Sequence, residues 1–126
     1  MAKYIDGFVF SVPKKNLVAY RKMAKEGAKA WKKFGALEYF ECMGDDPETK
    51  DEGMGKTRSF VDLTKAKEDD TVWFSFIIFK NKKHRDMVNK KVQEYFGKKY
   101  AQMKDWEMPF DTKKMAVGGF IAEVVG

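Results

Sequence analysis

Residues Thr71–Phe79 read TVWFSFIIF, a run in which apolar side chains occupy both alternating sets of positions. Successive side chains of a β-strand point to opposite faces of a sheet, so this strand is apolar on both faces and needs cover on both. The two sets are Val72, Phe74, Phe76 and Ile78, and Trp73, Ser75, Ile77 and Phe79. One short chain supplies helices for only one side of such a sheet. The other side predicts contact with a second copy of the protein.

Length and composition predict a single folded domain, residues 1–126. Hydrophobic residues make up 44% and aromatic residues 15% of the chain, which excludes an intrinsically disordered protein. No apolar run approaches the roughly 20 residues of a membrane span, and the first residues lack the basic-then-apolar layout of a secretion signal. The single cysteine, Cys42, cannot form an internal disulfide. We therefore expect a cytoplasmic protein without membrane contact.

A net charge of +6 raises the question of a nucleic-acid partner. The lysines crowd two predicted helices, between Lys14 and Lys33 and between Lys80 and Lys99. Lysine-rich outer helix faces are common in soluble proteins, so this distribution does not favour a nucleic-acid partner.

Apolar periodicity and chain breakers predict six main elements: strands at Tyr4–Val12, Ala36–Met43, Thr71–Phe79 and Met115–Val125, and helices at Leu17–Phe34 and after Asn81. Asn16 and Asn81 are suited to cap the two helices, and Gly35 is suited to end the first. Gly44–Gly55 is expected to be a polar loop, and Lys56–Leu63 a short extra strand or an arm.

The order β-α-β-(β)-β-α-β predicts an α+β fold of the ferredoxin-like type, with an antiparallel sheet and both helices on one face. The other face stays apolar, because the strands at Tyr4–Val12 and Thr71–Phe79 do not alternate apolar with polar side chains. We therefore expect a homodimer in which the helix-free sheet faces pack together. Such an interface should bury more than roughly 2,000 Å² in total.

Four segments of the chain carry a family resemblance: YIDGFV (residues 4–9), GALEYFECMGDD (35–46), HRDMVN (84–89) and MPFDTKKMAVGGF (108–120). In this order, and spread over nearly the whole chain, they resemble the DUF1428 (YbaA-like) family. The resemblance implies membership of the dimeric α+β barrel group, with a ferredoxin-like protomer and a two-sheet dimer. It implies no particular activity, because that fold group includes cofactor-free monooxygenases, isomerases and stress-related proteins.

Motifs for cofactors and metals are thin. Gly118 and Gly119 lie inside a predicted strand and do not form a phosphate-binding loop, and the chain has no cluster of Cys and His. The loop at Gly44–Gly55 carries five carboxylates, but Pro47 interrupts it and its spacing does not match an EF-hand. We therefore predict no cofactor and no metal, and a solvated acidic loop.

His84 is the one residue with a pointed chemical interpretation. It lies in the first turn of the second helix, on the same stripe as Val88 and Val92, so its ring is expected to face the sheet. The helix N-terminus disfavours a protonated imidazole, and a neutral ring can accept a proton or orient a substrate oxygen. The more common alternative is a half-buried His that bonds to a neighbouring backbone or strand group. Arg85 and Asp86 are expected to point outward.

The strand at Ala36–Met43 supplies candidate partners for a pocket. Glu41 shares one face with Tyr39, and Glu38 lies on the other, so either orientation places one carboxylate on an apolar face. A buried carboxylate needs a partner or a raised pKa, and either condition can mark a site. The alternative is an edge strand whose carboxylate reaches water. The candidate pocket residues are His84, Glu38, Glu41, Tyr39 and Trp73, although a core or interface position is more usual for the tryptophan.

Three functions remain open, and the sequence does not decide whether the protein is an enzyme. The first is binding or transformation of a small apolar molecule between sheet and helices. The second is a non-catalytic interaction or stress-related dimer. The third is RNA binding, since RNA-recognition domains share the element order, although Thr71–Phe79 lacks the Lys/Arg-Gly-Phe-Gly opening of their sheet motif.

Overall fold

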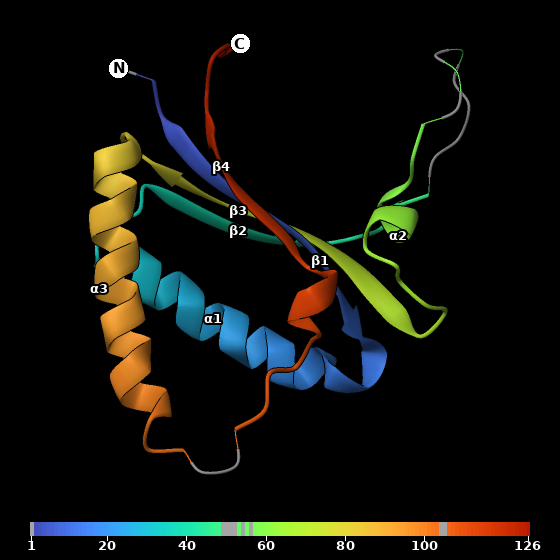
Figure 1. The fold of residues 1–126 in the computed structure, drawn as a ribbon, viewed down its shortest axis with the longest axis horizontal. Coiled ribbons are helices and arrows are strands. Elements are labelled where there is room, and N and C mark those ends of the chain that lie inside the picture. Colours follow the sequence, from blue (N-terminus) through green and yellow to red (C-terminus); the bar gives the residue numbers. More distant parts are fainter. Residues whose placement is uncertain (1, 49–52, 54, 56, 104–105) are drawn as a thin grey trace.

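A four-stranded antiparallel sheet and two long helices form the protein (Figure 1). The computed structural model describes residues 2–48, 53, 55, 57–103 and 106–126. The strands are β1 (Tyr4–Pro13), β2 (Glu38–Met43), β3 (Asp70–Phe79) and β4 (Ala116–Ile121), in the order β2-β3-β1-β4. The helices are α1 (Leu17–Lys33), α2 (Phe60–Leu63) and α3 (Lys82–Tyr100), with 3-10 turns at Lys14–Asn16 and Thr112–Lys114. The ferredoxin-like α+β prediction is confirmed.

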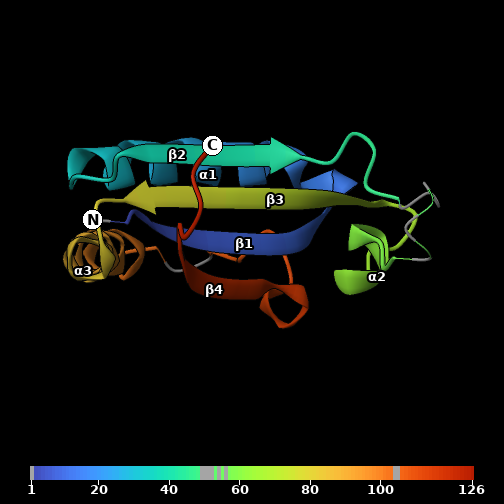
Figure 2. The ribbon, with the colours of Figure 1, turned by 90° about the horizontal axis from the view of Figure 1, so that it is seen from above.

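The two long helices lie on the same side of the sheet. Figure 2 looks onto the sheet from above and shows the four strands side by side, with α1 beyond them. Within the described part of the chain, neither α1 nor α3 crosses the face turned to the viewer. No helix among the described residues is both long enough and apolar enough to cross a bilayer.

The central strands β1 and β3 decide which side chains face the helices. They pair along their whole length, from Tyr4 opposite Phe79 to Pro13 opposite Asp70. Opposite residues share a face, so Phe10 of β1 and Trp73 of β3 both point toward α1. The helix side holds two buried clusters, one around Phe10, Val12, Tyr20, Ala24, Trp73 and Phe110, and one around Ala30, Ala36, Ile77, Phe79, Val88 and Val92.

Residues at the helix ends fix how the chain enters and leaves the sheet. The Asn81 side chain accepts a hydrogen bond of 2.8 Å from the His84 N–H, as predicted for an N-cap. Gly35 ends α1 with a φ of 119°, which an L side chain rarely adopts. Asn16 does not cap α1 with its side chain; its amide Nδ2 donates to the Pro109 carbonyl at 3.0 Å instead. This bond ties the start of α1 to the segment that leads into β4.

The strand alternative for Lys56–Leu63 is wrong for its described part. Residues Phe60–Leu63 form the one-turn helix α2. The Ser59 side chain accepts a hydrogen bond of 3.1 Å from the Asp62 N–H, so a serine cap outweighed the β-forming residues in this stretch. Residues 49–52, 54 and 56 lie outside the described residues, and with them part of the acidic loop Gly44–Gly55.

Candidate functional site

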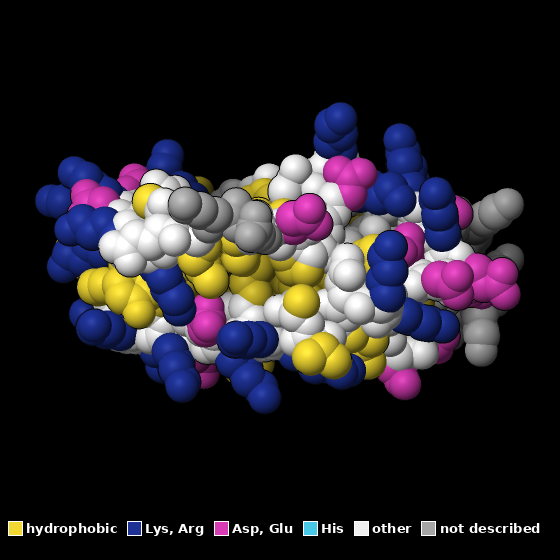
Figure 3. Space-filling view, turned by 90° about the horizontal axis from the view of Figure 1, so that it is seen from below, with side chains coloured by type: hydrophobic (Ala, Val, Ile, Leu, Met, Phe, Trp, Pro, Cys, Tyr) yellow, Lys and Arg dark blue, Asp and Glu magenta, His cyan; other side chains and the backbone are white. Residues whose placement is uncertain are grey.

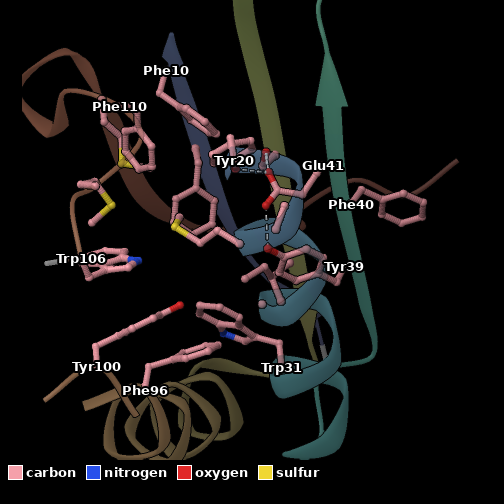
Figure 4. A pocket seen from close by; sticks show the side chains of 18 residues that line it. Phe10, Tyr20, Trp31, Tyr39, Phe40, Glu41, Phe96, Tyr100, Trp106 and Phe110 are labelled. Atoms are coloured by element: carbon pink, nitrogen blue, oxygen red, sulfur yellow. Dashed lines mark hydrogen bonds between the residues drawn. The ribbon is translucent and has the colours of Figure 1, made fainter. Parts of the chain in front are cut away.

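A cavity of about 370 Å³ lies between the helix side of the sheet and α1. The C-terminal half of α3 and the segment from Trp106 to Met115 complete its walls (Figure 4). Its lining is dominated by aromatic side chains, among them Phe10, Trp31, Phe96, Tyr100, Trp106 and Phe110. On the side of the molecule shown in Figure 3, hydrophobic side chains gather in a hollow that lysine and acidic side chains surround.

Local sequence spacing explains one aromatic wall. Phe96 and Tyr100 are four residues apart on α3, so they share a helix face and stack with ring centroids 5.5 Å apart. Trp106 stacks on Tyr100 at 4.6 Å, and Trp31 of α1 lies 6.2 Å from Phe96. These four rings form a continuous row that joins α1, α3 and the segment after α3. The other walls come mainly from the sheet and from the first half of α1.

A carboxylate and three hydroxyl groups form the polar end of the cavity. The register of β2 and β3 places Glu41 opposite Ser75, with Tyr39 two residues away on the same face. Tyr20 of α1 donates to Glu41 Oε1 at 2.7 Å, and Tyr39 donates to Oε2 at 2.6 Å. The Ser75 hydroxyl also donates to Oε1. All four side chains line the cavity, and Figure 4 shows Tyr20 and Tyr39 on either side of the carboxylate.

Burial and the carboxylate keep both tyrosines protonated. Burial raises the pKa of Tyr20 and of Tyr39 well above the ordinary tyrosine range, and the negative charge of Glu41 and the hydrogen bonds to it add to the rise. Each hydroxyl therefore stays protonated and donates a hydrogen bond to Glu41. Among the described residues, the ion pairs join Arg85 to Asp6 and Asp86, and Lys99 to Glu26, so none of them includes Glu41.

The structure brings two of the predicted pocket residues together, Glu41 and Tyr39. Glu38 lies on the opposite face of β2, where its side chain is exposed. Trp73 is buried beside the cavity and does not line it: its ring packs 4.8 Å from Tyr20, and its Nε1–H donates to Thr71 Oγ1 at 2.9 Å. The strand therefore faces the helices with the Glu41 set of side chains.

His84 lies apart from this cavity, at the start of α3. Its Nδ1 accepts a hydrogen bond of 3.0 Å from the Lys80 N–H, and its ring meets the ring of Phe79 edge to face at 5.9 Å. Its Nε2 lies close to Gly35, 3.3 Å from the position that a Cβ there would take. The helix stripe places the ring toward the sheet, but at the end of β3 remote from the cavity, since only the second half of α3 lines it.

A second polar cluster lies beneath α3, and it corrects the expectation for Arg85. The guanidinium turns inward: its Nη1 donates to the buried Asp6 at 2.9 Å, and the group lies over the Tyr4 ring. Asn89 donates to the other Asp6 oxygen at 3.0 Å and accepts from the Trp31 Nε1–H at 2.9 Å. Arg85 turns inward because the buried carboxylate of Asp6 in β1 needs a charged partner.

Two members of the cavity's polar end were not identified as site residues from sequence. Tyr20 belongs to the apolar stripe of α1, which predicts a core position and not a hydroxyl bonded to a carboxylate. Ser75 gave a usable signal, since it is the single polar residue within the helix-facing set of the TVWFSFIIF run, apart from Thr71 at its start. A lone hydroxyl on a buried face needs a hydrogen-bond partner, and Glu41 is that partner.

Comparisons with known proteins place the chain among uncharacterised relatives. Residues 3–112 match a family model described as "Protein of unknown function (DUF1428)". The chain is 40% identical over 120 residues to a protein called "Uncharacterized protein YbaA" in Escherichia coli strain K12, covering 94% of each chain. A protein of the same description in Shigella flexneri matches equally well, at 40% identity over 94% of each chain.

Proposed function

The chain belongs to the DUF1428 family, and we propose that it binds a small, largely apolar molecule in the cavity between the sheet and the helices. The cavity of about 370 Å³ is the observation that supports this proposal. Protein cores are packed densely, with few voids larger than a water molecule. Small-molecule pockets measure roughly 300 to 1,000 Å³, with apolar walls and a few placed polar groups.

The Glu41 cluster gives the cavity the second property of a ligand site. A carboxylate and its three hydroxyl donors meet at one end, while the remaining walls are mainly aromatic. Glu41 is half-buried, and a carboxylate withdrawn from water costs a fold free energy unless hydrogen bonds replace its lost hydration. We infer that this cost is retained because the carboxylate orients a ligand. A carboxylate oxygen of Glu41 can also accept a proton from a bound molecule, so transformation of the ligand is part of the proposal.

Methionine NMR tests whether the cavity takes up a small molecule. Met23, Met108 and Met115 line the cavity, whereas Met43 and Met87 are exposed and lie outside it. With methyl-labelled methionine, we expect added indole to shift the three lining methyl signals in a saturable way. The two outer methionines serve as internal controls. Shifts confined to Met43 and Met87, or no saturable shift at all, would contradict the proposal.

We also propose that the protein forms a homodimer, in which two copies pack together through the sheet face that carries no long helix. Its strand positions expose large apolar side chains, with Phe40 at 44%, Phe74 at 46% and Phe120 at 61% exposure. Contiguous apolar patches of this kind mark interaction surfaces. The described strand positions of this face carry no Lys or Arg, which argues against RNA as the occupant.

Sedimentation equilibrium tests the dimer. We expect the wild type to be dimeric at micromolar concentration and Phe74→Glu to raise the dimer dissociation constant at least about tenfold, because a carboxylate would be buried without a partner. Val18→Glu is the control, since Val18 is 82% exposed on α1. A monomeric wild type would refute the dimer proposal. Binding of single-stranded RNA that Phe74→Glu abolishes would favour the RNA alternative.

A further inference from the structure

The hydrogen atoms at the polar end of the cavity are already committed. Tyr20, Tyr39 and Ser75 each carry one hydroxyl hydrogen, and each gives it to Glu41. The Nε1–H of Trp31 is bonded to Asn89 at 2.9 Å. The groups around Glu41 therefore offer a ligand lone pairs and no free hydroxyl hydrogen. A ligand that binds there must bring its own donor.

Glu41 keeps room for that donor. A carboxylate has about four lone-pair sites, two on each oxygen. Oε1 accepts from both Tyr20 and Ser75, whereas Oε2 accepts from Tyr39 alone. One acceptor site on Oε2 is therefore left over by the hydrogen bonds among the described residues. Because Glu41 lines the cavity, a bound molecule can reach this oxygen.

Charge narrows the choice of donor. The three hydroxyl groups satisfy hydrogen bonds of the carboxylate, but they are neutral and do not balance its charge. The ion pairs among the described residues involve Asp6, Asp86 and Glu26 and leave Glu41 without a cation. An opposite charge placed beside a carboxylate in an apolar cavity gains far more than it would in water. An anionic ligand would meet repulsion from the same group.

The aromatic walls favour the same charge. The faces of aromatic rings attract ammonium groups, most strongly in Trp and Tyr. Trp31 and Trp106 supply such rings around the cavity, and Figure 4 shows Trp106 on the side facing Glu41. These rings also stack against a flat apolar ligand body. The carboxylate thus favours a cationic group on the ligand, and the aromatic walls favour a flat apolar body next to it.

Building on the proposed cavity function, we propose that the ligand is a small hydrophobic amine, bound as its ammonium ion with an N–H donated to Glu41 Oε2 and its apolar body against the aromatic wall. This names a ligand class, the arylalkylamines and apolar alkylamines of similar size. A cavity of about 370 Å³ leaves room for one such molecule.

Four indoles of one shape test the proposal in the wild-type protein. All four share the indole N–H and differ in the side chain: that of tryptamine carries the ammonium, that of tryptophol a neutral hydroxyl, that of 3-ethylindole no polar group, and that of indole-3-acetate a negative charge. Calorimetry at pH 7 measures the affinities, and the NMR signals of the lining methionines show whether each compound binds in the cavity. We expect tryptamine to bind about tenfold or more tighter than tryptophol. The 3-ethylindole should bind more weakly than tryptophol, and indole-3-acetate weakest.

Variants on the two faces of β2 locate the effect. Glu41→Gln keeps the shape and removes the charge, so the preference for tryptamine over tryptophol should disappear. Glu38→Gln changes the same residue type on the exposed face and should leave the preference intact. If the four indoles bind the wild type equally, or the acetate binds best, the amine proposal is overturned while the cavity function stands. If none of the four binds, both are overturned. A preference that survives Glu41→Gln in the folded protein overturns the role of Glu41.

Discussion

Removal of the Arg85 guanidinium should expose how much the fold depends on the buried Asp6. The Asp6 side chain is 6% exposed, and the Arg85 side chain 21%. In Arg85→Ala, Asp6 keeps its bond from Asn89 but loses the cation 2.9 Å away. Breaking a buried pair by removing one partner costs about 3 to 5 kcal/mol. Water entering through the vacated space favours the lower end, so we expect a loss of about 3 kcal/mol.

Urea unfolding, followed by circular dichroism at one fixed protein concentration, measures this loss. For a domain of this size the slope is roughly 1 to 3 kcal/mol per molar urea, so the midpoint should fall by roughly 1 to 3 M. The matched control is Asp86→Ala, because Arg85 also pairs with Asp86 at 2.8 Å, but the Asp86 side chain is 59% exposed. Exposed pairs contribute less than about 1 kcal/mol. Equal losses in the two variants would refute the reasoning that burial of Asp6 sets the cost.

Three further outcomes concern the polar end of the cavity. Tyr39→Phe removes one donor to Glu41 and should lower stability by about 1 to 3 kcal/mol in the same urea assay; a neutral change would mean that water replaces the bond. The pKa of Tyr20 and of Tyr39 is raised in the folded state. The stability that the two protonated hydroxyls contribute is therefore present below about pH 10 and is lost as the pH rises above it. Tyrosinate absorbance should show both rings ionising only with unfolding, and ionisation in the folded protein would contradict this. Gly27→Ala places a Cβ 2.9 Å from the Tyr39 hydroxyl, whereas Gly97→Ala meets nothing within 4 Å, so thermal unfolding should show Gly97→Ala gaining about 1 kcal/mol and Gly27→Ala gaining none.

The sequence predicted the sheet because its strongest signals are local. The TVWFSFIIF run is apolar on both faces, which is typical of a central strand, and β3 lies between β2 and β1. The same alternation showed that either Glu38 or Glu41 had to face the helices. It could not show which one, because β2 is an edge strand whose facing depends on the helix it packs against. Tyr20 of α1 settles the matter by its bond to Glu41.

The candidate site was only partly predictable, because periodicity gives a face and not a position along the sheet. His84 has the stripe position of a sheet-facing residue, yet it lies at the start of α3, while the cavity lies under the other half of that helix. Arg85 was expected to point outward, but it turns inward to Asp6. The attraction came from Asp6, which is 79 residues away in the chain, and no local pattern reports a pairing over that distance.

The two apolar regions of the molecule differ in a way that separates their proposed roles. The helix-free sheet face exposes Phe40, Phe74 and Phe120, and the described strand residues of this face include no cluster of buried polar side chains. A surface without directional groups can gain stability from simple burial, which suits self-association. The cavity on the other side contains a carboxylate held by three hydroxyl groups, and this carboxylate interacts favourably only with a molecule that carries a hydrogen-bond donor. Occupation of the cavity should therefore depend on ligand chemistry, whereas closure of the open face should depend on area.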